Sequence, residues 1–388
     1  MRPSHRELAE RQIARDRLAT RRFPSLLARK QGRMLASAHA FLRGSAPLFY
    51  ELLRERPDLL PSLAGDGIIV GDMHLENVGA YRADDDEVVF GLNDFDDAAQ
   101  GPWALDVLRL AASAFLASRS FGADGPLLVR LVEGLAHAHA RSAGGAARAL
   151  PMPAVVQELL ERAARRTGAE LLDERAPRLR GRRRISRGER YIELPARVRR
   201  AAPGLVASYL SDRPGGFRIE DCAQRIAGTG SLGVVRVAVL LSLEDGRERL
   251  LDFKEARPSA VAALVRQPPG DDAERMVRAA RALSERPPKR LRAVRVAPLG
   301  LSFVGRRFTP QEDKLDLARL HPGHRLDELF AFVGQLLGRA HRRAARTPPR
   351  RSWSDREIRA LVGAAAELAA EVLGVHLAYA LRLGDGPG

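Results

Sequence analysis

GDMHLENVGAYRADDDEVVFGLNDFDDAAQGPWALDVLR, residues 71–109, is the stretch that decides the interpretation of this chain. Two apolar runs, residues 68–70 and 88–90, flank its turn-rich part and have the composition of short strands. The polar side chains beside these runs are Asp72, His74, Glu76, Asn77, Asp94, Asp96 and Asp97. Because catalytic groups often stand at strand ends and in the adjoining loops, the pattern indicates metal and phosphate chemistry.

Two of these residues have the spacing of a phosphotransfer catalytic loop. Asp72 and Asn77 form D-x-x-x-x-N, in which the Asp orients or deprotonates the attacking hydroxyl and the Asn binds magnesium. Asp94 follows a strand-like run and matches the second metal-binding Asp. Magnesium needs few carboxylates when phosphate oxygens complete its coordination. We therefore expect Asp72 to be catalytic, and Asn77 and Asp94 to hold Mg²⁺.

Asp106 and His74 are expected to support this loop. Asp106 lies in a helix expected from residue 105, where it could brace the catalytic loop from below. His74 could bind a metal, but a lone His beside a turn is more often a structural hydrogen-bonding group. The competing interpretation of the whole stretch is an acidic surface turn, which the correct spacing in two separate pieces disfavours.

A second motif, GTGSLG at residues 228–233, fits G-x-G-x-x-G. Alone it is a weak signal, and in a dinucleotide site a helix should follow it. Here a β-branched, strand-like run and a hairpin turn follow instead, which is typical of a flap over nucleotide phosphates. The residues expected to bind the nucleotide there are Gly228, Gly230, Ser231 and Gly233. The competing interpretation is a hairpin turn with spare glycines.

Lys254 favours the interpretation of the glycine motif as a phosphate-binding flap. It lies in an apolar, strand-like run, in a chain whose basic residues are almost all Arg. Only four of the 64 basic residues are lysines. A strand Lys that reaches the α- and β-phosphates is what a kinase needs, and the broader guanidinium of Arg would replace it poorly. A surface Lys pointing outward is the competing interpretation. Glu274, in the helix expected next, is predicted to partner Lys254, with Glu255 and Asp271 as alternatives.

Composition narrows the classes of protein. The net charge of +16 would suit an anionic partner, but the heavy use of Arg and Ala is typical of a GC-rich genome. Aromatic residues make up 5%, too few for a base-stacking surface, so nucleic acid is an unlikely partner on composition. The single Cys222 excludes an internal disulfide and a multi-cysteine metal site. No apolar signal segment or membrane span is expected, so we predict a cytoplasmic location.

Composition and the expected secondary structure divide the chain into five parts. They are an N-terminal helical segment (1–69), a catalytic-loop and metal-site part of a helical lobe (70–140), an Arg/Ala-rich helical connection (141–203), a strand lobe with the glycine flap (204–310) and C-terminal helices completing the helical lobe (311–388). Helices are expected at 105–116, 127–139, 154–166, 272–284, 326–343 and 354–383, and strands at 234–243 and 249–256. The basic run at 178–190 is expected to be a solvated loop, although a binding patch remains the alternative.

Several motifs carry a family resemblance. GDMHLEN followed by NDFDDAAQGPWALDVLRLAAS resembles the signature of the uncharacterised bacterial family called domain of unknown function 2252. FLRGS at 41–45, GTGSLG with KEA at 254–256, and GQLLGRAHRR at 334–343 also resemble it, so the match covers roughly residues 25–345. The loop motifs are similar to those of aminoglycoside and choline phosphotransferases in the protein-kinase-like superfamily. That resemblance implies catalytic Asp72, metal ligands Asn77 and Asp94, and ATP with Mg²⁺ as cofactors.

The order of the motifs departs from that superfamily. In kinases the glycine flap and its Lys precede the catalytic loop, whereas Gly228 and Lys254 follow Asp72 here. A circular permutation accounts for this order, since chain ends can be rejoined at the surface; coincidence of one motif is the alternative. We therefore expect an α+β, bilobal, protein-kinase-like fold in permuted order.

The functional hypothesis is an ATP- and Mg²⁺-dependent phosphotransferase acting on a hydroxyl of a small molecule or a protein. A nucleotide-binding pseudokinase, a nucleotidyltransferase and a metal-dependent phosphoesterase built on Asp72, His74, Asp94 and Asp96 are the alternatives. A basic scaffold or nucleic-acid-binding protein is the non-enzymatic one. The acceptor, the group transferred and the oligomeric state stay open.

Overall fold

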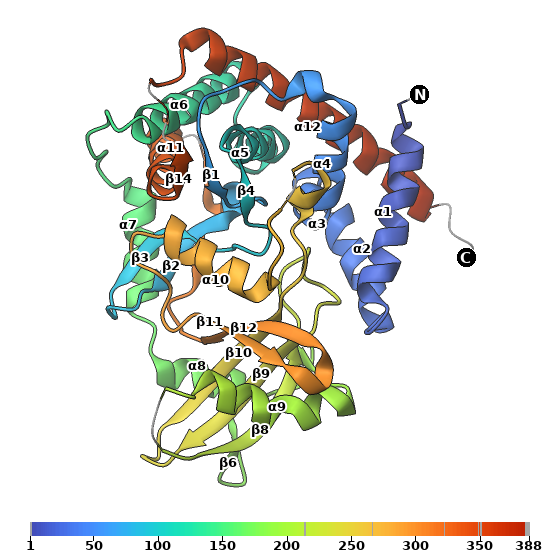
Figure 1. Ribbon diagram of the computed structural model, residues 1–388, viewed down its shortest axis with the longest axis vertical. Helices are drawn as coiled ribbons and strands as arrows, with labels where there is room; N and C mark the ends of the chain where they lie inside the picture. The colour runs from blue at the N-terminus through green and yellow to red at the C-terminus, as the bar shows by residue number, and fades with distance from the viewer. Residues whose placement is uncertain are drawn as a thin grey trace.

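The structure, a computed structural model, describes residues 2–212, 215–265, 267–321, 323–347, 349 and 351–384. It is a mixed α+β protein with several antiparallel sheets, so the α+β part of the expectation is confirmed. A six-stranded sheet lies at one end of the molecule and most of the helices lie at the other (Figure 1).

All neighbouring strands of the large sheet are antiparallel. Its strands, in spatial order, are β11 (Arg292–Val296), β12 (Leu301–Arg307), β10 (Glu248–Glu255), β9 (Arg236–Leu243), β8 (Phe217–Arg225) and β7 (Tyr191–Ile192). Two of its strands, β7 and β8, precede the glycine motif in the chain. Helix α9 (Ala196–Tyr209) covers one face, where Leu205, Val237 and Phe253 belong to one buried apolar cluster. Alternation along β9 and β10 places their other side chains on the opposite face, which is the face that positions the site.

Helix α5 (Ala104–Ala117) lies at the centre of the helical part (Figure 1). Twelve of its 14 residues are buried, so it is surrounded by protein on every side. Two of the buried residues, Asp106 and Arg109, are charged and therefore need partners. The helices of this part are α1 (His5–Thr20), α2 (Leu27–Leu35), α3 (Ala38–Gly44), α4 (Ala46–Glu55), α6 (Gly125–Ala143), α11 (Leu326–Arg343) and α12 (Asp355–Gly384).

Two small sheets stand between the helices and the large sheet. One consists of β14 (Ala345–Thr347), β1 (Asp66–Ile69) and β4 (Ala99–Pro102), and the other of β13 (Asp313–Lys314), β2 (Val78–Arg82) and β3 (Val88–Leu92). The loop from β1 to β2 contains Asp72 and Asn77, and the loop from β3 to β4 contains Asp94, Asp96 and Asp97. The two small sheets therefore present both polar loops to the large sheet.

Most expected elements are confirmed within a few residues, including α11, whose bounds match the expectation. The connection before the large sheet contains the expected helix, α7 (Ala154–Ala164), and also α8 (Gly168–Arg175) and a hairpin of β5 (Arg178–Leu179) and β6 (Arg182–Arg183), which were not expected. The basic run is thus partly ordered rather than a plain loop. Its arginines form ion pairs within the chain, such as Arg183 with Glu248 and Arg187 with Asp221.

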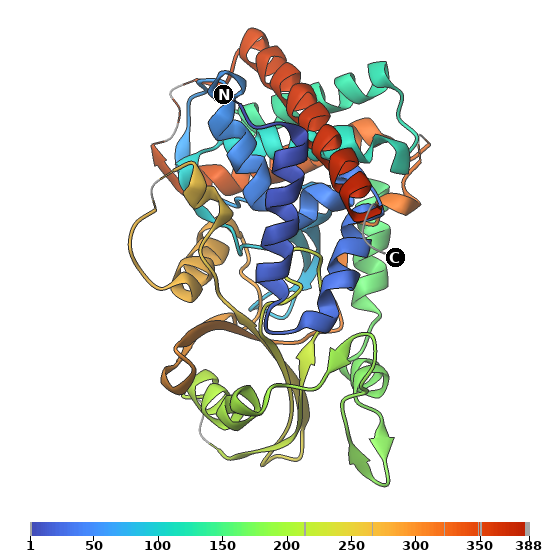
Figure 2. The same cartoon turned by 90° about the vertical axis from the view of Figure 1, so that its right-hand side faces the viewer.

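The last helix, α12, is long and apolar enough to cross a membrane by length and composition alone. A core helix of a soluble protein meets the same test, so the expectation of no membrane span is not contradicted and stays a prediction. In the structure α12 packs against α1 and α5, and Figure 2 shows it beside α1. Leu361, Leu368 and Val375 on its packed face are fully buried, whereas Leu373, Leu377 and Leu381 are exposed.

Candidate functional site

The loop between β1 and β2 is held from below by Asp106 of α5. Its Oδ2 accepts a hydrogen bond from the backbone N–H of Val70 at 2.6 Å, and its Oδ1 accepts from Gly71 N–H at 2.8 Å. The bracing role expected for Asp106 is therefore confirmed. Its Oδ2 also lies 2.9 Å from Nε2 of His341 in α11, and that ring stacks on Trp103. A buried carboxylate needs hydrogen-bond donors on each oxygen. Because the backbone N–H groups of Val70 and Gly71 supply them, Asp106 fixes the backbone at the start of the loop.

Gly71 is required at the start of this loop. Its φ of +83° lies in the left-handed region, and a Cβ there would stand 1.9 Å from the carbonyl oxygen of Asp97. The two polar loops therefore touch through backbone atoms at this position. Tyr50 of α4 also donates its hydroxyl hydrogen to Gly71 O, which closes the loop from the helical side.

Asp72 forms a buried ion pair that the sequence did not reveal. Arg109 donates Nε–H to Oδ1 of Asp72 at 2.8 Å and also contacts this oxygen through Nη2. The guanidinium is fully buried, donates to Leu42 O at 3.0 Å and lies 4.8 Å from the ring centre of Phe49. Burial raises the pKa of Asp72, whereas Arg109 lowers it, and burial is the larger effect. Oδ2 of Asp72 makes no hydrogen bond within the described residues. Asp72 lines a cavity between the polar loops and the glycine motif.

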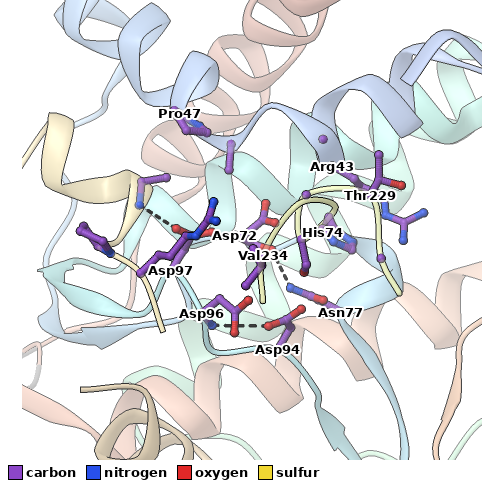
Figure 3. Close-up of a pocket in the computed structure, with 18 of the residues that line it drawn as sticks. Arg43, Pro47, Asp72, His74, Asn77, Asp94, Asp96, Asp97, Thr229 and Val234 are labelled. Carbon is purple, nitrogen blue, oxygen red and sulfur yellow. Dashed lines mark hydrogen bonds between the residues drawn. The ribbon is translucent and has the colours of Figure 1, made fainter. Parts of the chain in front are cut away.

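Asn77 has a buried side-chain oxygen without a hydrogen-bond donor, which a cation would satisfy. Its Nδ2 donates to Asp72 O at 2.7 Å, whereas its buried Oδ1 has no partner within the described chain. Asp72, Asn77 and Asp94 line the same cavity (Figure 3). A buried carbonyl oxygen without a donor is costly in an apolar setting and favourable beside a metal ion. The residues present therefore fit Mg²⁺ held by Asn77 and Asp94.

Three carboxylates follow one another in the second loop and differ in their environment. Although burial alone would raise the pKa of Asp94, Lys254 and then Lys314 hold that pKa below its ordinary value. Burial, and then the charge of Asp94, raises the pKa of Asp96. Burial, and then Asp72, raises the pKa of Asp97 to about 6. Asp94 is thus the carboxylate of the loop that stays ionised most readily, as a metal ligand must.

Lys254 of β10 reaches across to this loop. Its Nζ lies 3.6 Å from Oδ1 of Asp94 and forms a close ion pair with Asp96. The structure therefore brings the strand Lys and the expected metal ligand together, although 160 residues separate them in the chain.

Glu274 does not take part in this arrangement. It lies exposed on α10 (Asp272–Leu283) and lines a different hollow of the surface, and Lys254 has Asp94 and Asp96 as its acidic partners. The two alternatives are engaged elsewhere as well, since Glu255 pairs with Arg22 and Asp271 caps α10. The prediction of a helix Glu as the partner is therefore wrong. Helix α10 is tied to the site instead by Arg275, which donates to Asp96 O and Ala98 O.

The glycine motif lies over the cavity, but the N-terminal helices hold it in place. Gly228, Gly230 and Ser231 line the cavity with Asp72. Lys30 of α2 donates to Thr229 O at 3.2 Å, and Arg33 donates to Gly228 O. Gly233 has a φ of +93°, and a Cβ there would lie 2.2 Å from Ala19 O. The loop is therefore packed against α1 and α2 instead of standing free between two strands.

Two joined cavities fill the space between the large sheet and the two polar loops. The outer one, of about 220 Å³, is lined by Asp72, Asn77, Asp94 and the glycine loop. The inner one, of about 310 Å³, shares Asp94, Asp96, Gly228, Ser231 and Lys314 with it and contains Lys254. Lys314 was not predicted, and within the described residues it forms no ion pair. Its signal in the sequence is that it is one of only four lysines.

Within the described residues, no three His, Cys, Asp or Glu side chains form a group that could hold a metal ion. His74 is buried and accepts a hydrogen bond from Glu76 N–H at 3.2 Å through its Nδ1. That contact agrees with a structural role for His74.

Comparison with known proteins gives one result. A family model described as an uncharacterised protein conserved in bacteria (DUF2252) matches residues 22–384. No curated protein and no solved structure matches the chain.

Proposed function

The chain belongs to this uncharacterised bacterial family, and we propose that it is a cytoplasmic, ATP- and Mg²⁺-dependent phosphotransferase that acts on a hydroxyl group. In this proposal the fold is a protein-kinase-like one in circularly permuted order, with the nucleotide between the large sheet and the helical part. The observation that carries the proposal is that Asp72, Asn77 and Asp94 line one cavity, while Lys254 lines a second cavity that shares Asp94 and lies 3.6 Å from that carboxylate. These residues come from loops and a strand far apart in sequence, and their chemical types suit phosphate and metal.

Each side chain has a distinct role in the proposed reaction. Asn77 and Asp94 would hold Mg²⁺, which neutralises phosphate charge when bound. Lys254 would exchange its contact with Asp96 for phosphate oxygens, since its ammonium group already lies at the loop that would bind the metal. Asp72 would accept the proton of the acceptor hydroxyl through Oδ2, because Arg109 occupies Oδ1 and fixes the carboxylate. Such a site works mainly by positioning and charge neutralisation.

The proposal is tested by the thermal midpoint with and without millimolar ATP and Mg²⁺. Binding to the native state raises the midpoint by mass action. We expect a Mg²⁺-dependent rise in the wild type that Lys254→Ala and Asp94→Ala both remove. Lys289→Ala and Asp327→Ala are the matched controls, because Lys289 pairs with Asp86 and neither residue lines the two cavities, and because Asp327 is 69% exposed. No rise in the wild type would count against nucleotide binding.

Asp72→Asn separates transfer from binding. The variant should keep the rise in midpoint with ATP and Mg²⁺ but lose transfer of phosphate from ATP, measured as ADP formation. ATP-dependent ADP formation that survives this substitution would contradict the assignment of Asp72. A wild type that binds ATP and forms no ADP with any acceptor would agree with a pseudokinase.

A further inference from the structure

Three arginines converge on one buried carboxylate at the inner cavity. Arg225 of β8, Arg236 of β9 and Arg306 of β12 all contact Asp252 of β10, which is 2% exposed. Arg225 donates to Oδ2 at 2.6 Å, and Arg236 donates Nε–H to Oδ1 at 2.9 Å. Antiparallel pairing places Arg306 directly opposite Asp252. We call these three residues the arginine wall; all of them line the inner cavity.

The wall has more donors than its carboxylates can accept. Arg306 has Glu312 as a second partner, with Nη1 2.8 Å from Oε1 of that residue. The three guanidinium groups therefore share two carboxylates, those of Asp252 and Glu312. A carboxylate offers about four lone-pair positions, whereas each guanidinium carries five N–H donors. Within the described residues, Nε and Nη2 of Arg225 and Nη1 of Arg236 have no hydrogen-bond partner. None of these donors is among the buried side-chain atoms without a partner, so they are open to the cavity, where an anion could accept hydrogen bonds from them.

The geometry keeps these spare donors in place. The Arg225 guanidinium stacks on Phe308 at 4.1 Å from the ring centre, while its Nη1 binds Asp252. Burial, and then the neighbouring Arg236, lowers the pKa of Arg225, which expresses the repulsion between the two cations. Lys314 adds a cation that forms no ion pair within the described chain, where the inner cavity joins the outer one. The inner cavity thus has cationic side chains at the wall and at Lys254 and Lys314, and carboxylates at Asp94, Asp96, Glu312 and Asp313.

We propose that the arginine wall is a binding site for a chain of phosphate groups, separate from the expected metal site. Arg binds phosphate oxygens through pairs of parallel N–H bonds, and the spare donors of Arg225 and Arg236 offer that pattern. Asp252 has the role of orienting the guanidinium groups. The phosphate chain could belong to a nucleotide or to a free inorganic oligophosphate. The site goes beyond the proposed transfer reaction and does not depend on it.

The test is calorimetric titration of the full chain with inorganic tripolyphosphate in EDTA at about 150 mM salt. EDTA removes metal ions, so binding under these conditions does not require a metal ion held by Asn77 and Asp94. We expect measurable binding that Arg225→Gln and Arg236→Gln each weaken at least tenfold, since a hydrogen bond to a charged group contributes about that much. Arg225→Lys should restore part of the affinity because it keeps the charge but not the fork.

Arg295→Gln is the matched control for net charge. It removes one positive charge from a neighbouring strand, and the Arg295 side chain is 76% exposed. Loss of affinity as large as that of Arg225→Gln would mean general attraction to a chain of charge +16 and would overturn the site. Absence of tripolyphosphate binding to the wild type would also overturn it. Circular dichroism and the thermal midpoint establish that each variant is folded.

Competition with ATP and adenosine identifies the source of the phosphate chain. ATP that displaces tripolyphosphate and needs the same arginines places the phosphate chain of a nucleotide at the wall. ATP that does not displace it assigns the wall to free oligophosphate. Both results retain the site, and adenosine alone should not compete. Failure of the proposed function would show up separately, as loss of the Mg²⁺-dependent ATP effect while tripolyphosphate binding persists.

Discussion

Replacement of Arg109 by Met tests how the candidate catalytic carboxylate is held. The guanidinium is fully buried and binds Asp72 Oδ1 through Nε at 2.8 Å and Leu42 O through Nη2 at 3.0 Å. Removal of one partner from a buried ion pair costs about 3–5 kcal/mol. The Asp72 side chain keeps 22% exposure, so water would relieve part of that cost. We therefore expect a loss near the lower end, about 3 kcal/mol.

The measurement is equilibrium unfolding in guanidinium chloride for the wild type, Arg109→Met, Asp72→Asn and the double variant. The two tryptophans, Trp103 and Trp353, are both buried in the helical core that contains Arg109, so their fluorescence follows the relevant part of the chain. Coincidence with far-ultraviolet circular dichroism is needed for a two-state analysis. The double variant should be more stable than the sum of the single losses predicts, because it removes both charges.

The reasoning is refuted if Arg109→Met costs less than about 1 kcal/mol, the scale of an exposed ion pair. Simple additivity in the double-mutant cycle would equally show that Arg109 and Asp72 do not interact. Arg109→Lys is the conservative control: it keeps the charge but lacks the fork that binds both Asp72 and Leu42 O. It should recover only part of the stability.

Two further predictions concern the contact between the polar loops. Gly71→Ala should destabilise by more than the roughly 1–2 kcal/mol of a left-handed residue, because the new Cβ would meet Asp97 O at 1.9 Å. Gly246→Ala, with a φ of +76° and no neighbour within 4 Å, measures the conformational part alone, and equal losses would contradict the clash. Asp97 has a raised pKa of about 6, so its contribution to stability is present below the unfolded pKa and is lost as the pH rises through 6. The thermal midpoint of Asp97→Asn relative to wild type should therefore be higher at pH 7.5 than at pH 4.5, and a pH-independent difference would contradict the raised pKa.

The local motifs could be predicted because they depend on near neighbours. The amphipathic period of α11 and the β-branched runs of β9 and β10 follow from side chains a few residues apart. The spacing of Asp72 and Asn77 also predicted correctly that they lie on one short loop, and Asp106 was placed beneath that loop by its position at the start of α5. Backbone geometry fixes such relations over short distances.

The partners of the charged residues could not be predicted in the same way. The structure pairs Lys254 with Asp96 and Asp94 and leaves Glu274 exposed, although the helix Glu was the expected partner. The ordered β5 and β6 hairpin and the short strand β7 were missed, because two-residue strands leave no periodic signal.

The sequence by itself determined the α+β class, most helices and strands, the family resemblance and the residues of the two polar loops. Only the tertiary structure decided that Arg109 holds Asp72, that Lys314 lines both cavities and that Arg225, Arg236 and Arg306 share Asp252. The physical reason is that one Arg resembles another in a chain with so many of them. What distinguishes them is the loss of water around each one, and that depends on contacts between segments far apart in the chain.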